Sequence, residues 1–323
     1  MTTYTKSNAE KVYIFPLDSI LQNNKTVIEK FSDSIKIRGY AYVKLSPEIV
    51  GQVDECVKNI EDFFKNEKEY KELYTKKPIF GYFDAKHKES FRLLTGKRLS
   101  EHKLPIKFEQ IKKMSNLSDK LMHRLCRMTT PYLFPDIDEK LKQIDIPLFR
   151  FNNYWGMFDI TKYKNDGSKT GLNCNAHYDP GLLSIHYRST QPGLQLKNEH
   201  GEWISPPKDN NVAIIWAGDV ATKINPDIKH GMHRVANNGI GTPRIAIWYE
   251  ICSAEQEHKE LITTETKELA KIEHYSGIPI SKSMAPSTSL STSPSTSPST
   301  SPFMLRSMSR SMSPSFGYAI DWN

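Results

Sequence analysis

The segment that decides the fold reads His177-Tyr178-Asp179-Pro180-Gly181-Leu182-Leu183-Ser184. On a β-strand, residues two apart point to the same face, so the imidazole of His177 and the carboxylate of Asp179 can reach one metal ion. Pro180 restricts Asp179 to extended backbone angles, which helps to hold that geometry. The spacing therefore predicts two ligands of one metal ion on a single strand.

A third ligand is predicted from a second β-rich run, His233-Arg234-Val235. Two histidines and one carboxylate on one face of an octahedron leave three positions open. Such a site suits non-haem Fe(II), which needs room for a cosubstrate and dioxygen. His230 is the alternative third ligand, and zinc is the alternative metal because the same residue types can hold it.

Short β-rich runs surround this segment from about residue 148 onward, and Gly, Asn and Pro separate them. Many short strands at near-regular spacing predict a sandwich or barrel. The sequence contains no GxGxxG or Walker motif that would favour a doubly wound sheet instead. The predicted strands are 148–154, 173–179, 182–187, 193–196, 212–216, 233–236 and 244–251.

The first third of the chain predicts one strand and two helices. Tyr40–Val43 is an aromatic and β-branched run typical of a strand. Ser46-Pro47-Glu48 has the capping hydroxyl, the proline and the acid that open a helix, and apolar residues recur with helical spacing up to Phe64. A second helix is predicted around 116–130, where leucines recur every four residues.

The C-terminal part contains two segments of different composition. Residues 255–274 predict a charged amphipathic helix. In 281–302, eighteen of twenty-two residues are Ser, Thr or Pro. Such a segment cannot bury enough apolar surface to offset the entropy lost on ordering, so we expect 281–323 to be disordered.

Composition excludes several classes of protein. The 323 residues hold 44 basic and 37 acidic side chains, and the net charge of +7 is mild and lacks the basic stripe of a nucleic-acid binder. No apolar run is long enough for a membrane-spanning helix, and the N-terminus does not resemble a secretory signal. The four cysteines are widely separated, which favours free thiols in a reducing compartment. We therefore expect a cytoplasmic monomer with neither nucleic acid nor membrane as a partner.

The blocks HYDPGLLS, GLQL, GEWI, GD and HRV, followed by Arg244, occur in an order that resembles the isopenicillin N synthase-like branch of the Fe(II)/2-oxoglutarate-dependent dioxygenases. The resemblance covers roughly 10–255 and is strongest over 148–252. It implies a mainly β fold with helical flanks around a double-stranded β-helix, or jelly-roll, core. The expected regions are a mixed helical region at 1–140, the jelly-roll core at 141–255, a helix at 256–280 and the tail at 281–323.

The resemblance also implies cofactors and residue roles. Fe(II) is the implied metal, 2-oxoglutarate the cosubstrate, dioxygen the oxidant and ascorbate an optional reductant, with a small organic molecule as substrate. An arginine suits the distal carboxylate of 2-oxoglutarate because its planar guanidinium binds carboxylates in a bidentate manner. The implied iron ligands are His177, Asp179 and His233, and the implied cosubstrate-binding residues are Arg244, Tyr154 and Asn152.

One departure from the family keeps the function open. The family usually has Arg-x-Ser, whereas this chain has Ala246 at the third position. Losing one hydrogen bond to a charged group weakens binding by about 1.5–3 kcal/mol unless another group replaces it. We expect an enzyme that oxidises its substrate, by hydroxylation in the first instance, and releases succinate and CO2. The alternatives are an Fe(II) oxidase that does not use 2-oxoglutarate and a non-catalytic binding protein on the same scaffold.

A few polar residues outside these motifs have a predicted place. Arg92 and its basic neighbours either face an anionic substrate or are solvated, and His102 is expected to be solvated. His186 is expected on the face shared with Arg188, at the surface or just behind the metal ligands.

Overall fold

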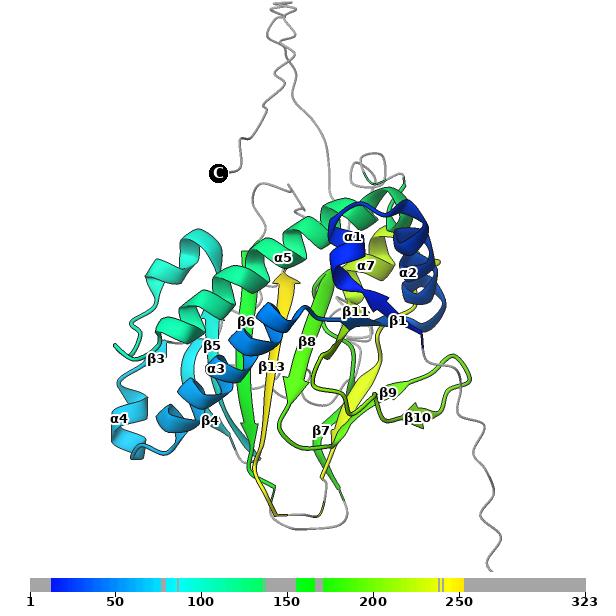
Figure 1. Ribbon diagram of the computed structural model, residues 1–323. Coiled ribbons are helices and arrows are strands. Elements are labelled where there is room, and N and C mark those ends of the chain that lie inside the picture. Colours follow the sequence, from blue (N-terminus) through cyan, green and yellow to red (C-terminus); the bar gives the residue numbers. More distant parts are fainter. Residues whose placement is uncertain are drawn as a thin grey trace, which may run out of the picture. The chain divides into compact units, whose positions relative to one another are not determined.

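The structure, a computed structural model, describes residues 13–76, 80–85, 87–135, 137, 155–165, 171–237, 239 and 241–252. Two sheets face each other, and helices cover the outer face of the larger sheet (Figure 1). The predicted strand 148–154, the helix at 255–274 and the tail at 281–323 lie outside the described residues.

The element bounds, in chain order, are as follows. The strands are β1 (Ile14–Pro16), β2 (Tyr40–Lys44), β3 (Thr75–Lys76), β4 (Phe80–Ala85), β5 (Lys88–Leu94), β6 (Trp155–Tyr163), β7 (Leu172–His177), β8 (Leu183–Ser189), β9 (Leu194–Lys197), β10 (Trp203–Ile204), β11 (Val212–Ala217), β12 (His233–Ala236) and β13 (Arg244–Cys252). The helices are α1 (Leu17–Leu21), α2 (Lys25–Arg38), α3 (Pro47–Phe64), α4 (Lys68–Glu72), α5 (Glu109–Leu133), α7 (Asp219–Ile224) and the 3-10 helix η1 (Gly96–Glu101).

The eight strands from β6 to β13 form the predicted jelly roll. The larger sheet has the order β1-β2-β11-β8-β13-β6-β5-β4-β3, and the smaller sheet has the order β10-β9-β12-β7. The chain passes between the two sheets so that β6, β8, β11 and β13 lie in one and β7, β9, β10 and β12 in the other. This arrangement is the double-stranded β-helix, and each strand predicted from 173 onward is present.

The N-terminal region contributes more strand than its sequence predicts. β1 and β2 extend the larger sheet beyond β11, and β3 to β5 extend it beyond β6. The strand β5 was not predicted because its inward positions are polar. Phe91 and Leu93 pack in the core under the helices, whereas Ser90 and Arg92 occupy the alternate positions.

The two predicted helices are confirmed. Ser46 caps α3 by accepting a hydrogen bond from the backbone N–H of Ile49 at 3.4 Å. The helix predicted around 116–130 is the central part of α5. In Figure 1, α5 and α3 run across the larger sheet over β6, β13 and β8. Their apolar faces therefore bury the outer face of this sheet.

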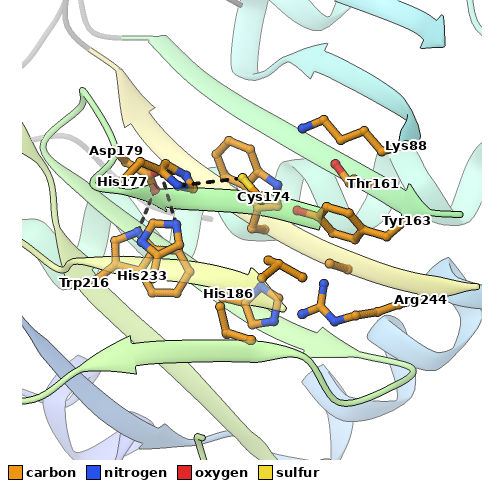
Figure 2. A pocket seen from close by; sticks show the side chains of 14 residues that line it. Lys88, Thr161, Tyr163, Cys174, His177, Asp179, His186, Trp216, His233 and Arg244 are labelled. Carbon is orange, nitrogen blue, oxygen red and sulfur yellow. Dashed lines mark hydrogen bonds and ion pairs between the residues drawn. The ribbon is translucent and has the colours of Figure 1, made fainter. Parts of the chain in front are cut away.

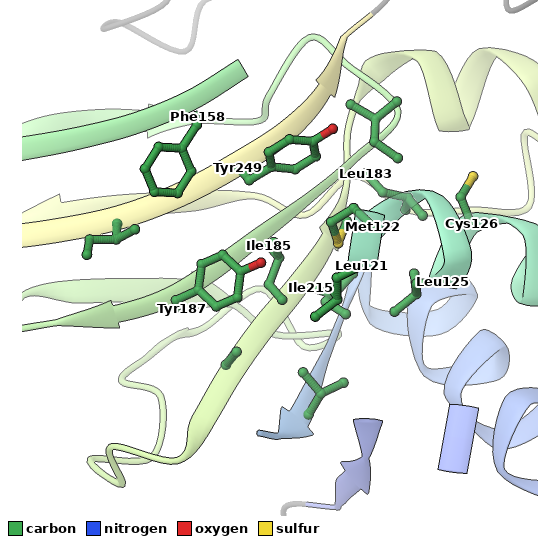
Figure 3. Close-up of a cluster of buried hydrophobic side chains, with 14 of the residues drawn as sticks. Leu121, Met122, Leu125, Cys126, Phe158, Leu183, Ile185, Tyr187, Ile215 and Tyr249 are labelled. Carbon is green, nitrogen blue, oxygen red and sulfur yellow. The ribbon is translucent and has the colours of Figure 1, made fainter. Parts of the chain in front are cut away.

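The larger sheet separates two cores by simple alternation. On β8, Leu183, Ile185 and Tyr187 point toward α5, where Met122 and Leu125 meet them (Figure 3). The alternate residues on the same strands point into the space between the two sheets. That inner space also holds the apolar side chains of Tyr40, Tyr42, Tyr163, Cys174, Leu194, Leu196, Val212, Ile214, Trp216, Val235 and Ala246.

A β-bulge interrupts the alternation of β8. His186 pairs with Trp248 of β13 but Arg188 pairs with Ile247, which leaves Tyr187 as an extra residue. The expectation that Arg188 shares a face with His186 is therefore wrong. The bulge turns Arg188 outward, where it pairs with Asp54 of α3.

Other side chains also differ from expectation. Arg92 is only 2% exposed and forms an ion pair with Asp159 at 2.6 Å, so it is not solvated. His102 is also buried, and its Nε2 accepts a hydrogen bond from the backbone N–H of Leu94 at 2.8 Å. The four cysteines are free, as predicted, and all four are buried. Among the described residues, no helix combines the length and apolarity that crossing a bilayer requires.

Candidate metal centre

The space between the sheets holds a cavity lined by polar and apolar side chains, with the predicted metal ligands at one end and Arg244 at the other (Figure 2). Strands of both sheets line it. The residues that line the cavity are Lys88, Thr161, Tyr163, Cys174, His177, Asp179, His186, Leu194, Trp216, His233, Val235, Arg244, Ala246 and Trp248.

His177, Asp179 and His233 converge at one point. His177 ends β7 and His233 begins β12, and the two are register partners in the smaller sheet. The Oδ1 atom of Asp179 lies 3.9 Å from Nε2 of His177 and 3.8 Å from Nε2 of His233. One ligand atom from each residue lies within 4.8 Å of the other two, and all three side chains are buried.

His230, the alternative ligand, lies elsewhere. Its ring stacks on Tyr178 with the centroids 4.0 Å apart, and its Nε2 lies 3.5 Å from Asp219. Tyr178 lies between His177 and Asp179 in the sequence, so His230 packs on the residue that separates the two predicted ligands. Among the described residues, the cluster of potential ligands contains His233 and not His230.

Backbone carbonyls fix the tautomer of both histidines. Nδ1 of His177 lies 2.8 Å from the carbonyl of Asn175, and Nδ1 of His233 lies 2.9 Å from that of Gly231. A carbonyl can only accept a hydrogen bond, so Nδ1 carries the proton in each ring. Nε2 is then the nitrogen of each ring that faces a metal ion.

Asp179 is oriented by two donors from neighbouring strands. Its Oδ2 accepts hydrogen bonds from the hydroxyl of Ser184 at 2.5 Å and the indole N–H of Trp216 at 2.6 Å. Ser184 and Trp216 are register partners on β8 and β11. The Trp216 ring also packs on His233 with centroids 4.3 Å apart. The role of Trp216 was not predicted, although its inward position follows from the alternation of β11.

The two histidines respond differently to their surroundings. Burial lowers the pKa of His233 to about 4, and the charge on His177 acts in the same direction. Burial also acts to lower the pKa of His177, but Cys174 and Asp179 outweigh it and raise this pKa to about 9. A metal ion that binds here would therefore displace a proton from His177.

The donor set fits a ferrous ion. Two neutral imidazoles and one carboxylate form the facial triad of non-haem Fe(II) oxygenases, which leaves positions for a cosubstrate and dioxygen. Bonds from nitrogen or oxygen to a metal of this size are about 2.0–2.2 Å long. The three donor atoms lie within 4.8 Å of one another, which is wider than ligands of one ion at that bond length, so the side chains would close around a metal ion as it binds.

Arg244 has one unused donor nitrogen. The side chain is 1% exposed, its Nε donates to the carbonyl of Gln191 at 3.1 Å, and its Nη2 donates to Ser189. Nη1 is buried without a hydrogen-bond partner among the described residues. A buried guanidinium nitrogen without a hydrogen-bond partner fits an anionic ligand, and a carboxylate is the natural match.

Two residues of β6 lie beside Arg244 and were missed. Tyr163 is the register partner of Arg244, and Thr161 is that of Ala246. The guanidinium carbon lies 5.2 Å from the centroid of the Tyr163 ring. The predicted cosubstrate residues Asn152 and Tyr154 lie outside the described residues. The signal for Thr161 and Tyr163 was a hydroxyl residue and a tyrosine two apart, which places both on one face of a strand.

The comparisons with known proteins agree with this architecture. The model of the 2OG-Fe(II) oxygenase superfamily matches residues 148–253. Gibberellin 2-beta-dioxygenase 1 of Arabidopsis thaliana is 29% identical over 87 residues, which are 27% of this chain and only 26% of that relative. The match therefore spans about a quarter of the length of this curated relative.

Two solved structures share the fold at low sequence identity. Dioxygenase for auxin oxidation 1 of Arabidopsis thaliana, in a binary complex with 2-oxoglutarate, is 18% identical with a TM-score of 0.61, over 79% of this chain and 99% of that chain. The rice dioxygenase for auxin oxidation is 16% identical with a TM-score of 0.62, over 83% and 97%. Residues 148–253 are thus similar in sequence to the 2OG-Fe(II) oxygenase superfamily, and the solved structures share the fold.

Proposed function

We propose that this protein is an Fe(II)- and 2-oxoglutarate-dependent dioxygenase that oxidises a small organic molecule. The observation that carries the proposal is the convergence of His177, Asp179 and His233 at one end of a buried cavity whose other end presents Arg244. The superfamily match supplies the reaction class, and the geometry supplies the residues that would carry it out.

Each residue has a distinct role in this proposal. His177, Asp179 and His233 would hold Fe(II), and Arg244 would hold the distal carboxylate of 2-oxoglutarate through Nη1. When bound, Fe(II) would supply the activation of dioxygen, coupled to the conversion of 2-oxoglutarate to succinate and CO2. Trp216 keeps Asp179 oriented. The metal-binding side chains and Arg244 are buried, and burial strengthens these electrostatic contacts.

A second candidate is an Fe(II) oxidase that does not use 2-oxoglutarate. Ala246 favours it because the usual hydroxyl is absent at this position. The buried Nη1 of Arg244 favours 2-oxoglutarate instead, because an isolated cationic donor inside a protein is costly without an anionic partner.

Anaerobic titration with Fe(II) followed by 2-oxoglutarate tests the proposal. We expect a weak visible charge-transfer band that appears only after 2-oxoglutarate is added. Iron binding without the band would support the oxidase that does not use 2-oxoglutarate, and no iron binding would support a binding protein. Succinate release across a panel of metabolites would then identify the substrate class.

Several broader expectations are also proposals. We infer that the protein acts as a cytoplasmic monomer without a nucleic-acid or membrane partner. The mild net charge and the four free, buried cysteines support this inference. The division into regions 1–140, 141–255, 256–280 and 281–323, and the roles of Asn152 and Tyr154, remain predictions from the sequence.

A further inference from the structure

Residues with hydroxyl groups lie on both strands beside Ala246, the position at which the family usually has a serine. Ala246 faces the cavity on β13, two residues after Arg244. Its register partner on β8 is Ser189, and its register partner on β6 is Thr161. A hydroxyl is therefore present on each neighbouring strand beside the alanine.

Of these two hydroxyls, only that of Ser189 has a hydrogen bond to Arg244. Nη2 of Arg244 donates to the Oγ of Ser189. The Thr161 hydroxyl is instead engaged with Ser90 at 2.8 Å and donates to Asp159 at 3.0 Å. Ser189 therefore holds the guanidinium of Arg244, whereas Thr161 belongs to a separate hydrogen-bond network with Ser90 and Asp159.

The bulge in β8 is what brings Ser189 to the cavity side. In an unbroken strand, residues three apart point to opposite faces, so His186 and Ser189 could not meet. The extra residue Tyr187 reverses the alternation. As a result, Nε2 of His186 lies 2.9 Å from the Oγ of Ser189.

His186 connects this hydroxyl to the metal end of the cavity. It is 6% exposed, and its ring stacks on Trp216 at 5.9 Å between centroids and 21° between planes. Trp216 in turn donates to Asp179. Contacts thus run without a break from Arg244 through Ser189, His186 and Trp216 to the carboxylate of the metal site.

We propose that Ser189, oriented by His186, replaces the hydroxyl that Ala246 lacks and positions Arg244 for the distal carboxylate of 2-oxoglutarate. The guanidinium is held at Nε by Gln191 and at Nη2 by Ser189, so that Nη1 is presented to the ligand. This inference rests on the proposed function. Ser189 and His186 are positioning residues because they act through Arg244.

Calorimetric titration of 2-oxoglutarate into the Mn(II)-loaded full-length protein tests this inference without turnover. Ser189→Ala should raise the Kd of 2-oxoglutarate about tenfold, as expected for the loss of a hydrogen bond to a charged group, and leave the Kd of Mn(II) unchanged. Ser189→Thr keeps a hydroxyl and should keep the affinity. Thermal unfolding confirms that each variant is folded.

A double-mutant cycle tests whether the Ser189 hydroxyl takes the place of a hydroxyl at position 246 or only supports the local structure. In the Ser189→Ala background, Ala246→Ser should restore the affinity, whereas in the wild-type background it should change little. His186→Phe keeps the stacking on Trp216 but removes Nε2, so it should weaken binding as much as Ser189→Ala, without additivity between the two.

Three outcomes would overturn the inference. Unchanged affinity in Ser189→Ala would remove the role of this hydroxyl, and failure of Ala246→Ser to rescue would show that the two positions are not equivalent. A loss of affinity in Thr161→Val but not in Ser189→Ala would assign the role to β6. If the wild-type protein itself does not bind 2-oxoglutarate, the proposed function fails with it.

Discussion

The two faces of the larger sheet differ in what their residues do, although the same strands supply both. On β8, Ile185 points into the apolar core under α5, and its neighbour Ser184 holds Asp179. On β11, Ile215 packs in that core, and Trp216 donates a hydrogen bond to Asp179 of the candidate metal site. Adjacent residues therefore serve either stability or chemistry, and a substitution should affect one property and largely spare the other.

The largest effect is expected on the inner face at Asp179. Asp179→Ala removes the only carboxylate of the described cluster and should abolish Fe(II)-dependent turnover while the protein stays folded. Metal content, succinate release and thermal unfolding measured on one preparation check this. An active, iron-loaded Asp179→Ala enzyme would refute the ligand assignment.

The matched change on the outer face is Ile185→Ala. This side chain is fully buried, and its truncation should lower the free energy of unfolding by about 2–5 kcal/mol. Urea unfolding measures the loss, and the Kd for Mn(II) at a temperature where the variant is folded should equal that of the wild type. A large loss of metal affinity in the folded variant would break the separation between the faces.

A smaller effect is expected at Trp216, which orients a ligand but does not bind metal. Trp216→Phe keeps the ring beside His233 and removes the N–H that Asp179 accepts. Changes of this kind cost about 10–100-fold in metal affinity. Mn(II) titration tests this prediction, and an unchanged Kd would show that Ser184 alone orients the carboxylate.

The smallest effect is a pH dependence of stability from His102, remote from the metal site. Burial, with Lys76 nearby, lowers the pKa of His102 from 6.5 to about 4. Protonation therefore favours the unfolded chain, so stability is full above pH 6.5 and falls as pH drops from 6.5 toward 4. In His102→Gln the wild-type advantage at neutral pH should shrink through this window, as urea unfolding at several pH values would measure. An advantage that does not vary with pH would contradict the assignment.

The candidate metal triad was predictable because its signals are local. His177 and Asp179 are two apart in the chain, although β7 ends at His177 and Asp179 lies just beyond it, and the run that begins at His233 is short and clearly β. The jelly-roll strands were likewise predictable from their spacing. These features depend on residue type and alternation, which the sequence displays directly.

The remaining features depend on register, which the sequence does not display. The bulge at Tyr187 reverses the faces of Arg188 and Ser189, and only the pairing of β8 with β13 reveals it. The strand β5 was missed because Arg92 is buried by an ion pair with Asp159, a partner on another strand. A polar residue therefore looked solvated when it was part of the interior.

Anaerobic Fe(II) binding to His233→Ala and His230→Ala, measured by equilibrium dialysis beside the wild type, tests the central claim most directly. The two histidines are three residues apart, but only Nε2 of His233 lies beside Asp179, at 3.8 Å. We predict that His230→Ala binds Fe(II) as the wild type does and that His233→Ala does not. Iron retained by His233→Ala and lost by His230→Ala would contradict the account.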